Sequence, residues 1–207
     1  MSIQSQNMQL VLAQNMASLE THWSQSIPQQ EKGRKFEEKY AQLQYMFVGG
    51  DIEKLSEMKA DRAKEAARLK WIAYKDQFFS TVMIAEDAFE STQMESTPLN
   101  ALSSYIKEYK TTTSLPFDIT GKKSTDLKYY FGPNHYNTLK AYDKDVEKSE
   151  RLHLNELVPL GWKIVAWINK ALVIPMFDLF SSWGLHIGIV ILLMTLVIKL
   201  IILLFVF

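Results

Sequence analysis

Polar and apolar side chains alternate along residues 40–47, which read YAQLQYMF. Every odd position from Ala41 to Phe47 is apolar, whereas positions 42 and 44 are glutamines. An extended chain would therefore present one apolar face. The pair Gly49-Gly50 ends the run. The pattern predicts a β-strand with one buried face.

Three further segments carry the aromatic and β-branched residues that strands favour, and they are residues 71–85, 103–110 and 126–131. Turn-forming residues separate them, namely Thr97-Pro98, Leu115-Pro116, Gly121 and residues 132–134. Short strands at such spacing are typical of an antiparallel β-sandwich. The sequence thus predicts a mainly β domain over residues 1–150.

Residues 51–70 depart from this pattern. They are rich in strong helix formers with charges of both signs, and Asp51 is a suitable N-cap. We expect an exposed helix or a mobile loop here, because mixed charges favour a solvated face. A second, short helix is expected over residues 135–142, after the Gly-Pro turn.

Residues 157–183 are mostly apolar, but polar side chains interrupt them at Lys163, Asn169, Lys170 and Asp178. A helix that crosses a bilayer needs about 20 mostly apolar residues, and charges at its centre are unfavourable. We therefore expect an amphipathic helix that lies in the membrane interface, with its core bracketed by Pro159 and Pro175. A buried helix of a soluble domain is the alternative, because tryptophan also builds protein cores.

Two kinds of side chain would hold this segment, residues 151–183, at the interface. Tryptophan favours the level of the lipid headgroups, and lysine can extend its charge into water. The two lysines are seven residues apart, which places them on one helix face. The expected membrane-interface residues are Trp162, Lys163, Trp167, Lys170 and Trp183.

The last segment, residues 184–207, has one charged residue, Lys199, in an otherwise apolar run. Its length suffices for a transmembrane helix of about 34 Å. Gly184, Gly188, Leu192, Thr195 and Lys199 fall within a narrow stripe on a helical wheel. Such a face turns toward protein or a wet cavity rather than lipid, so Lys199 and Thr195 are the candidate functional residues.

Composition excludes several classes of function. The chain has 207 residues, with 23 basic and 23 acidic side chains, so no basic excess favours nucleic acid. Cysteine is absent, which excludes disulfides and thiolate metal sites. The four histidines are scattered, and the sequence contains no HExxH, GxSxG or glycine-rich phosphate loop. We expect no enzymatic activity, no catalytic residue, no metal and no cofactor.

Several segments, in order along nearly the whole chain, resemble the YidC membrane protein insertases of the Oxa/YidC/Alb family, in their Bacteroidetes-like form. They are residues 31–47, 70–87, 128–143, 154–170 and 174–201. The resemblance implies the C-terminal part of a periplasmic β-sandwich without enzymatic role, an interfacial helix, and the first transmembrane helix of the insertase core. It places Lys199, where the family more often has arginine, in a hydrophilic intramembrane groove.

The resemblance also implies partners and a location. Nascent membrane proteins would be inserted and helped to fold in the bacterial inner membrane, alone or with the Sec translocon. Ribosome contacts would come from regions absent here. Residues 1–183 would lie on the periplasmic side. Because further transmembrane helices of the family do not follow residue 207, a truncated fragment is expected.

Two alternatives remain open. The chain could be a tail-anchored envelope protein whose outer β-domain binds or chaperones a partner. It could also be an anchored carbohydrate-active enzyme on a sandwich fold, although no clustered pair of acids supports that activity.

Overall fold

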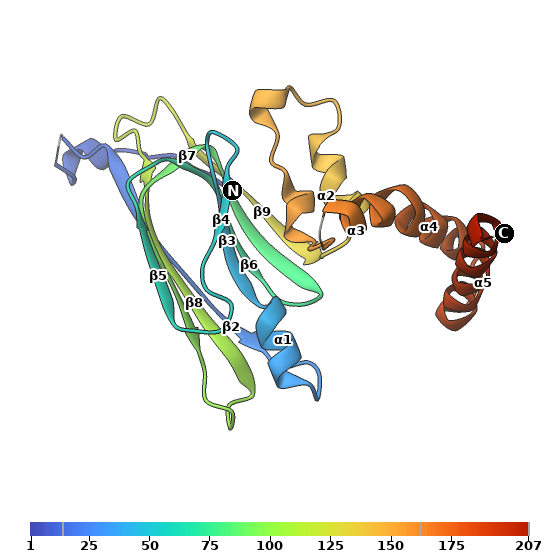
Figure 1. Ribbon diagram of the computed structural model, residues 1–207. Coiled ribbons are helices and arrows are strands. Elements are labelled where there is room, and N and C mark those ends of the chain that lie inside the picture. Colours follow the sequence, from blue (N-terminus) through green and yellow to red (C-terminus); the bar gives the residue numbers. More distant parts are fainter. Residues whose placement is uncertain (14, 162, 207) are drawn as a thin grey trace. The chain divides into compact units, whose positions relative to one another are not determined.

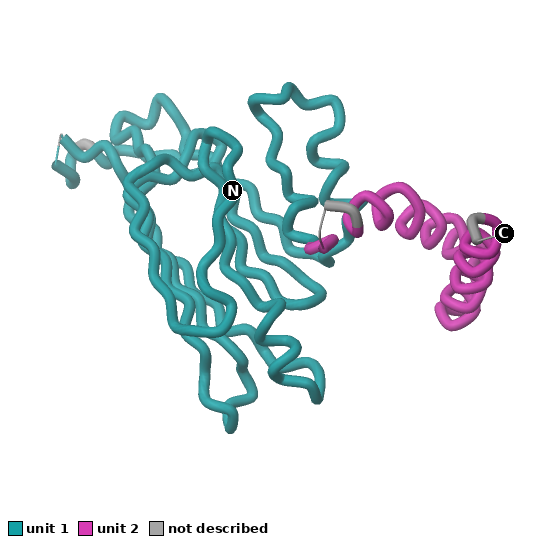
Figure 2. The backbone as a smooth tube through the Cα atoms, viewed as in Figure 1, with its two compact units in different colours: residues 1–158 teal, residues 159–207 magenta. Residues whose placement is uncertain are grey.

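The computed structural model describes all residues except 14, 162 and 207 (Figure 1). The chain forms two compact units, residues 1–158 and residues 159–207 (Figure 2). The first unit is built mainly from antiparallel β-strands and is called the β unit below. The second is helical and, because it contains the long apolar helix, is called the membrane unit. The expected fold class, a mainly β region followed by helices, is confirmed. The predicted division into 1–150, 151–183 and 184–207 stays a prediction.

The strands of the first unit form two layers. Layer 1 contains β4 (Ile52–Lys54), β3 (Gln42–Phe47), β6 (Leu69–Lys75), the first half of β7 (Phe79–Pro98), β9 (Thr125–Pro133) and β1 (Ser2–Ile3). Layer 2 contains β2 (Ser18–Pro28), β8 (Tyr105–Pro116), the second half of β7, and β5 (Asp61–Glu65). All neighbouring strands run antiparallel.

Strand β7 belongs to both layers. Residues 79–85 pair with β9 and β6, whereas residues 90–98 pair with β8. The register shifts between Glu90 and Gln93, and Ser91 has a φ of 49°. An extra residue in the left-handed region is a β-bulge, which bends a strand and increases its twist. This bulge lets one strand pass from the first layer into the second.

The main core lies between the two layers. Leu43 and Ile72 contribute to it from layer 1, and Tyr109 and Leu115 from layer 2. Trp23 of β2 stacks on Tyr74 of β6 with 3.7 Å between ring centroids. The Tyr74 hydroxyl donates to the Thr111 Oγ1 at 2.7 Å. The aromatic stack and the hydrogen bond join the layers at one place.

A covering segment, residues 136–158, closes the other face of layer 1. It comprises α2 (Tyr136–Lys140) and the 3₁₀ turns η2 (Ala141–Asp143), η3 (Lys148–Glu150) and η4 (Leu154–Leu157). Leu139, Leu154 and Leu157 are fully buried against a cluster that includes Trp71. The Trp71 Nε1 donates to the Leu152 carbonyl at 2.7 Å. The short helix expected at 135–142 is confirmed, as α2 and η2.

The strand predicted at 40–47 is confirmed as β3, and Ala41, Leu43 and Tyr45 do lie in the main core. The expectation of a single buried face is wrong, because Gln42, Gln44 and Met46 on the opposite face are buried as well. The segment 71–85 is instead a hairpin of β6 and β7. Asp76 forms its turn, because its Oδ1 accepts the backbone N–H groups of Phe78 and Phe79 at 2.7 and 2.5 Å. A carboxylate that caps two successive amides fixes such a tight turn.

The expectation of an exposed helix at residues 51–70 is wrong. This segment forms β4 and β5 and leads into β6. Asp61–Glu65 pairs with residues 92–96 of β7, and Ala63 packs against the main core. Ladder hydrogen bonds and burial outweigh helix propensity, which differs by less than about 1 kcal/mol per residue among ordinary residues. Strand β2 and helix α1 (Arg34–Tyr40) are additions to the predicted elements.

The second unit contains α3 (Lys163–Ile168), the π-helical turn η5 (Asn169–Val173), α4 (Ile174–Ser182) and α5 (Ile187–Val206). Pro175 was expected to end the helical core, and this is wrong, because it lies in the first turn of α4. Proline lacks a backbone N–H and crowds the preceding turn. The wider turn η5 directly precedes it, which is a known way for a helix to continue past such a residue.

Candidate functional site

Helix α5 is, among the described residues, the one helix long and apolar enough to cross a membrane. Most of its side chains are exposed within the chain, including Ile191 and Leu204 at 56% and 81%. A soluble protein rarely leaves so continuous an apolar surface uncovered. The surface suits lipid or further membrane helices.

One face of α5 packs against α4. Val190 is 1% exposed and lies in a cluster with Met176 and Phe180 of α4. The residues around this contact are Phe177, Leu185, Leu193, Met194, Val197 and Ile198. Trp183 meets Phe180 edge to face, with 5.2 Å between ring centroids. The two helices therefore form one packed apolar pair.

Lys199 and Thr195 lie on the other side of α5. At about 100° per residue, Lys199 is about 180° around the helix from Val190, and Thr195 about 140°. Both residues are exposed. The Thr195 hydroxyl donates to the Ile191 carbonyl at 2.8 Å, so it is satisfied within the helix. Residues 184–207 contain no aspartate or glutamate, so a counter-ion for Lys199 must come from elsewhere.

The expected membrane-interface residues occupy different positions. Trp162 lies outside the described residues, and Lys163 is the first residue of α3. Trp167 in α3 is 69% exposed and Trp183, at the end of α4, is 59% exposed. Lys170 is exposed in the π-helical turn. Exposed tryptophans on a helical segment suit an interface between water and lipid, and the interface role itself stays a prediction.

Sequence patterns did not indicate two buried lysines in the β unit. The Lys107 Nζ donates to the carbonyls of Ala41 and Glu57, both at 2.5 Å. The Lys75 Nζ donates to the carbonyl of Tyr40 at 3.1 Å. Burial lowers the pKa of each ammonium group to about 8, since charge is unfavourable away from water. Their contacts with backbone carbonyls indicate a structural role.

Comparison with known proteins gives the family. The model of the YidC periplasmic domain matches residues 1–175, which contain the whole β unit. This chain belongs to the YidC family. It is 48% identical over 191 residues to the membrane protein insertase YidC of Parabacteroides distasonis, an alignment covering 92% of this chain and 30% of that relative.

Other relatives of the same name are similar. The protein of Azobacteroides pseudotrichonymphae is 48% identical over 196 residues, 94% of this chain and 32% of its own length. That of Bacteroides fragilis is 47% identical over 191 residues, 92% of this chain and 31% of its own length. The chain thus spans about a third of the length of these YidC relatives. The periplasmic-domain match and the apolar helix α5 indicate an inner-membrane protein with a periplasmic domain.

Proposed function

We propose that this YidC chain forms the periplasmic domain and one core helix of an insertase that places nascent proteins into the inner membrane. The relatives' name, membrane protein insertase, supports this function over an anchored partner-binding protein or a carbohydrate-active enzyme. Insertion needs no covalent chemistry, so the proposal assigns no catalytic residue to the chain.

The division of α5 into two faces carries the proposal. The face with Val190 packs against α4, whereas the face with Thr195 and Lys199 is exposed on the other side of the helix. A lysine in the middle of an apolar helix is tolerated when it faces a wet cavity or a partner, and is costly against lipid. We infer that this open face lines a hydrophilic groove, completed by parts of the insertase outside residues 1–207.

The remaining roles follow from this arrangement. Residues 1–183 would lie on the periplasmic side, with the helical segment from Lys163 to Trp183 in the membrane interface. The Lys199 ammonium group would hydrate the groove and attract acidic residues of a substrate tail. Cooperation with the Sec translocon and binding of the ribosome would use surfaces that other parts of the insertase supply.

A chimera tests the role of Lys199. Residues 1–207 would replace the matching region of the Parabacteroides distasonis relative, and insertion of a dependent single-span protein would be followed by protease protection. We expect Lys199→Ala and Lys199→Glu to lower insertion several-fold, with the larger loss for glutamate because it reverses the charge. Lys199→Arg should retain most activity, since arginine supplies the same charge.

Leu200→Ala is the matched control, because Leu200 neighbours Lys199, is 58% exposed and carries no charge. It should insert the substrate as the unmodified chimera does. Equal activity of Lys199→Glu and the unmodified chimera, at equal membrane abundance, would remove Lys199 from the mechanism.

A further inference from the structure

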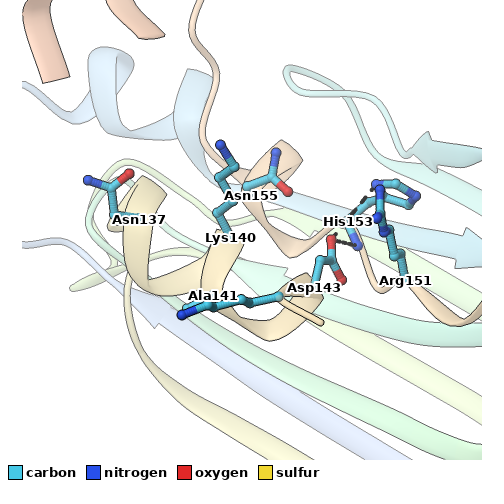
Figure 3. Close-up of a pocket in the computed structure, with 8 residues that line it drawn as sticks. Asn137, Lys140, Ala141, Asp143, Arg151, His153 and Asn155 are labelled. Carbon is cyan, nitrogen blue, oxygen red and sulfur yellow. Dashed lines mark hydrogen bonds and ion pairs between the residues drawn. The ribbon is translucent and has the colours of Figure 1, made fainter. Parts of the chain in front are cut away.

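A second candidate site lies in the β unit, in the covering segment that precedes the membrane helices. A cavity of about 460 Å³ opens beside α2, η2 and η4. Lys140, Lys144, Arg151 and His153 contribute basic groups to its wall, and Asp143 contributes the one carboxylate among the lining residues. Figure 3 shows Lys140, Asp143, Arg151 and His153 around this cavity. A cavity of this volume is large enough for a small organic ligand.

The carboxylate of Asp143 is already engaged by the backbone. Its Oδ1 accepts the N–H of Leu152 at 2.7 Å, and its Oδ2 accepts the N–H of His153 at 2.9 Å. The Oδ2 also lies 3.9 Å from the His153 Nδ1. Asp143 therefore fixes the loop from Leu152 to His153, and much of its negative charge is compensated by these donors.

The three permanent cations have no carboxylate partner, although the Lys140 Nζ lies 5.8 Å from the centroid of the Tyr136 ring, which is a weak cation–π contact. Among the described residues, no carboxylate lies within ion-pair distance of Lys140, Lys144 or Arg151, whereas Lys123 and Lys128 pair with Asp87 and Glu86 at 2.8 and 2.7 Å. The Arg151 Nε makes one long hydrogen bond of 3.3 Å, to the Val146 carbonyl. With Asp143 counted, the wall carries a net positive charge. Such a cavity attracts anions.

The backbone on both sides of the cavity is held firmly. Leu139 lies just before Lys140, and Leu154 follows His153, and both leucines are fully buried. The Trp71 Nε1 donates to the Leu152 carbonyl next to Arg151. A site whose supporting residues are already ordered loses less entropy on binding a ligand.

We propose that this cavity binds a phosphate-bearing anion, either the headgroup of an acidic phospholipid or a small soluble phosphate ester. Arginine and lysine are the side chains that bind phosphate oxygens most strongly. Asn155 and Lys163 are eight positions apart, so the chain between them can span at most about 28 Å. Because α3 begins the helical segment that we propose for the membrane interface, this connection sets an upper limit on the distance between the cavity and the lipid headgroups. This inference goes beyond insertion and does not depend on Lys199.

The test uses the full chain in a zwitterionic detergent. Native mass spectrometry would compare retention of short-chain phosphatidylglycerol with that of phosphatidylcholine of equal chain length. We expect preferential retention of phosphatidylglycerol, and a loss of about tenfold or more in affinity for the triple variant Lys140→Gln, Lys144→Gln, Arg151→Gln. Higher ionic strength should weaken binding, because it screens the charges.

A control triple variant, Lys32→Gln, Lys59→Gln, Lys64→Gln, removes the same charge from exposed positions elsewhere in the β unit. It should bind as the unmodified chain does, and circular dichroism would show that both triple variants keep their β structure. Exchange of lysine for arginine at 140 and 144 should preserve binding. Glycerol 3-phosphate serves as the soluble competitor. Binding of glycerol 3-phosphate as tight as that of phosphatidylglycerol would identify a soluble phosphate ester as the ligand, and much weaker binding would identify the lipid headgroup.

Three results would overturn the proposal. They are equal retention of phosphatidylcholine and phosphatidylglycerol with no binding of glycerol 3-phosphate, equal losses in both triple variants, and loss of binding when arginine replaces the lysines. Substrate insertion is not measured in any of these experiments, so their failure leaves the proposed function standing.

Discussion

The two units of this YidC chain treat charge and apolar surface in opposite ways. The β unit buries the lysines Lys75 and Lys107 inside and satisfies them with backbone carbonyls. The membrane unit leaves Lys199 and most of its apolar side chains uncovered by its own residues. A water-soluble domain must complete its contacts within one chain, whereas a membrane helix can leave them to lipid and to other helices. Substitutions should therefore cost far more in the first unit than in the second.

The largest effect is expected for Trp71→Ala in the β unit. Trp71 is fully buried, joins layer 1 to the covering segment and donates to the Leu152 carbonyl at 2.7 Å. Its truncation leaves a cavity and an unsatisfied carbonyl, so the free energy of unfolding should fall by about 3–5 kcal/mol. Denaturant titration followed by far-ultraviolet circular dichroism measures it. A change below about 1 kcal/mol would show that the covering segment contributes little.

A smaller loss is expected for Arg34→Lys at the start of α1. The Arg34 guanidinium donates to the carbonyls of Ser103 and Leu99 at 2.8 and 2.9 Å, and its Nε pairs with Glu38 at 2.8 Å. Lysine keeps the charge but lacks the planar fork, so at most part of this network can form. We expect a loss of about 1–3 kcal/mol in the same titration. The substitution Lys35→Gln, at an exposed position, should leave the free energy of unfolding unchanged. An equal loss of stability in that variant would refute the role of the Arg34 guanidinium.

Alkaline pH should stabilise the β unit. The folded pKa of Lys75 and Lys107 is about 8, below the ordinary value of 10.5, so above pH 8 the unfolded chain binds more protons than the folded one. Stability should thus rise between about pH 8 and pH 10, by about 2 kcal/mol per lysine. The window closes near pH 10, because burial raises the pKa of Tyr74 and Tyr109 and the unfolded tyrosines ionise first.

Denaturation midpoints measured across this pH range would check the rise. Lys107→Met should flatten the curve, because it removes one of the two buried amines, whereas Lys64→Met at an exposed position should leave it unchanged. A curve that falls from pH 8 to pH 10 in the unmodified chain would contradict the burial of these charges.

The smallest effects are expected in the membrane unit. Val190 is 1% exposed against α4, whereas its neighbour Ile191 is 56% exposed. Val190→Ala should broaden the distance distribution between spin labels on Leu179 of α4 and Leu196 of α5 in lipid bilayers. Ile191→Ala should leave it unchanged, because lipid contacts a smaller side chain equally well. Broadening by Ile191→Ala alone would mean that α4 contacts the other face.

Sequence patterns predicted those elements whose signal is local. The alternation at 40–47 predicted β3 and the face that enters the main core, but not the burial of the opposite face. The long apolar run at the end of the chain predicted α5. Residues 51–70 misled because their helix propensity is local, whereas their pairing with β7 joins residues about 30 positions apart. The prediction that Pro175 ends the helix failed for a related reason. The π-helical turn η5 before it does not follow from the spacing of apolar residues.

The candidate sites were only partly visible. Lys199 stood out because a charge interrupts an apolar run, but its position opposite the α4 contact depends on how two helices pack. Lys75 and Lys107 look like any other lysines in the sequence, and only the tertiary structure shows them buried. The cationic cavity likewise combines residues from α2, η2 and the loop before η4, and no spacing rule links them.

The bulged strand β7 has a consequence for how the β unit folds. Short connections join β6 to β7 and β7 to β8, so residues 69–116 form a continuous three-stranded ribbon from contacts close in sequence. Contacts of this kind form early because little loop entropy is lost. This ribbon already contains a strand of each layer, so it can act as a common folding nucleus to which the other strands of both layers add. The two layers therefore do not have to form separately and then dock.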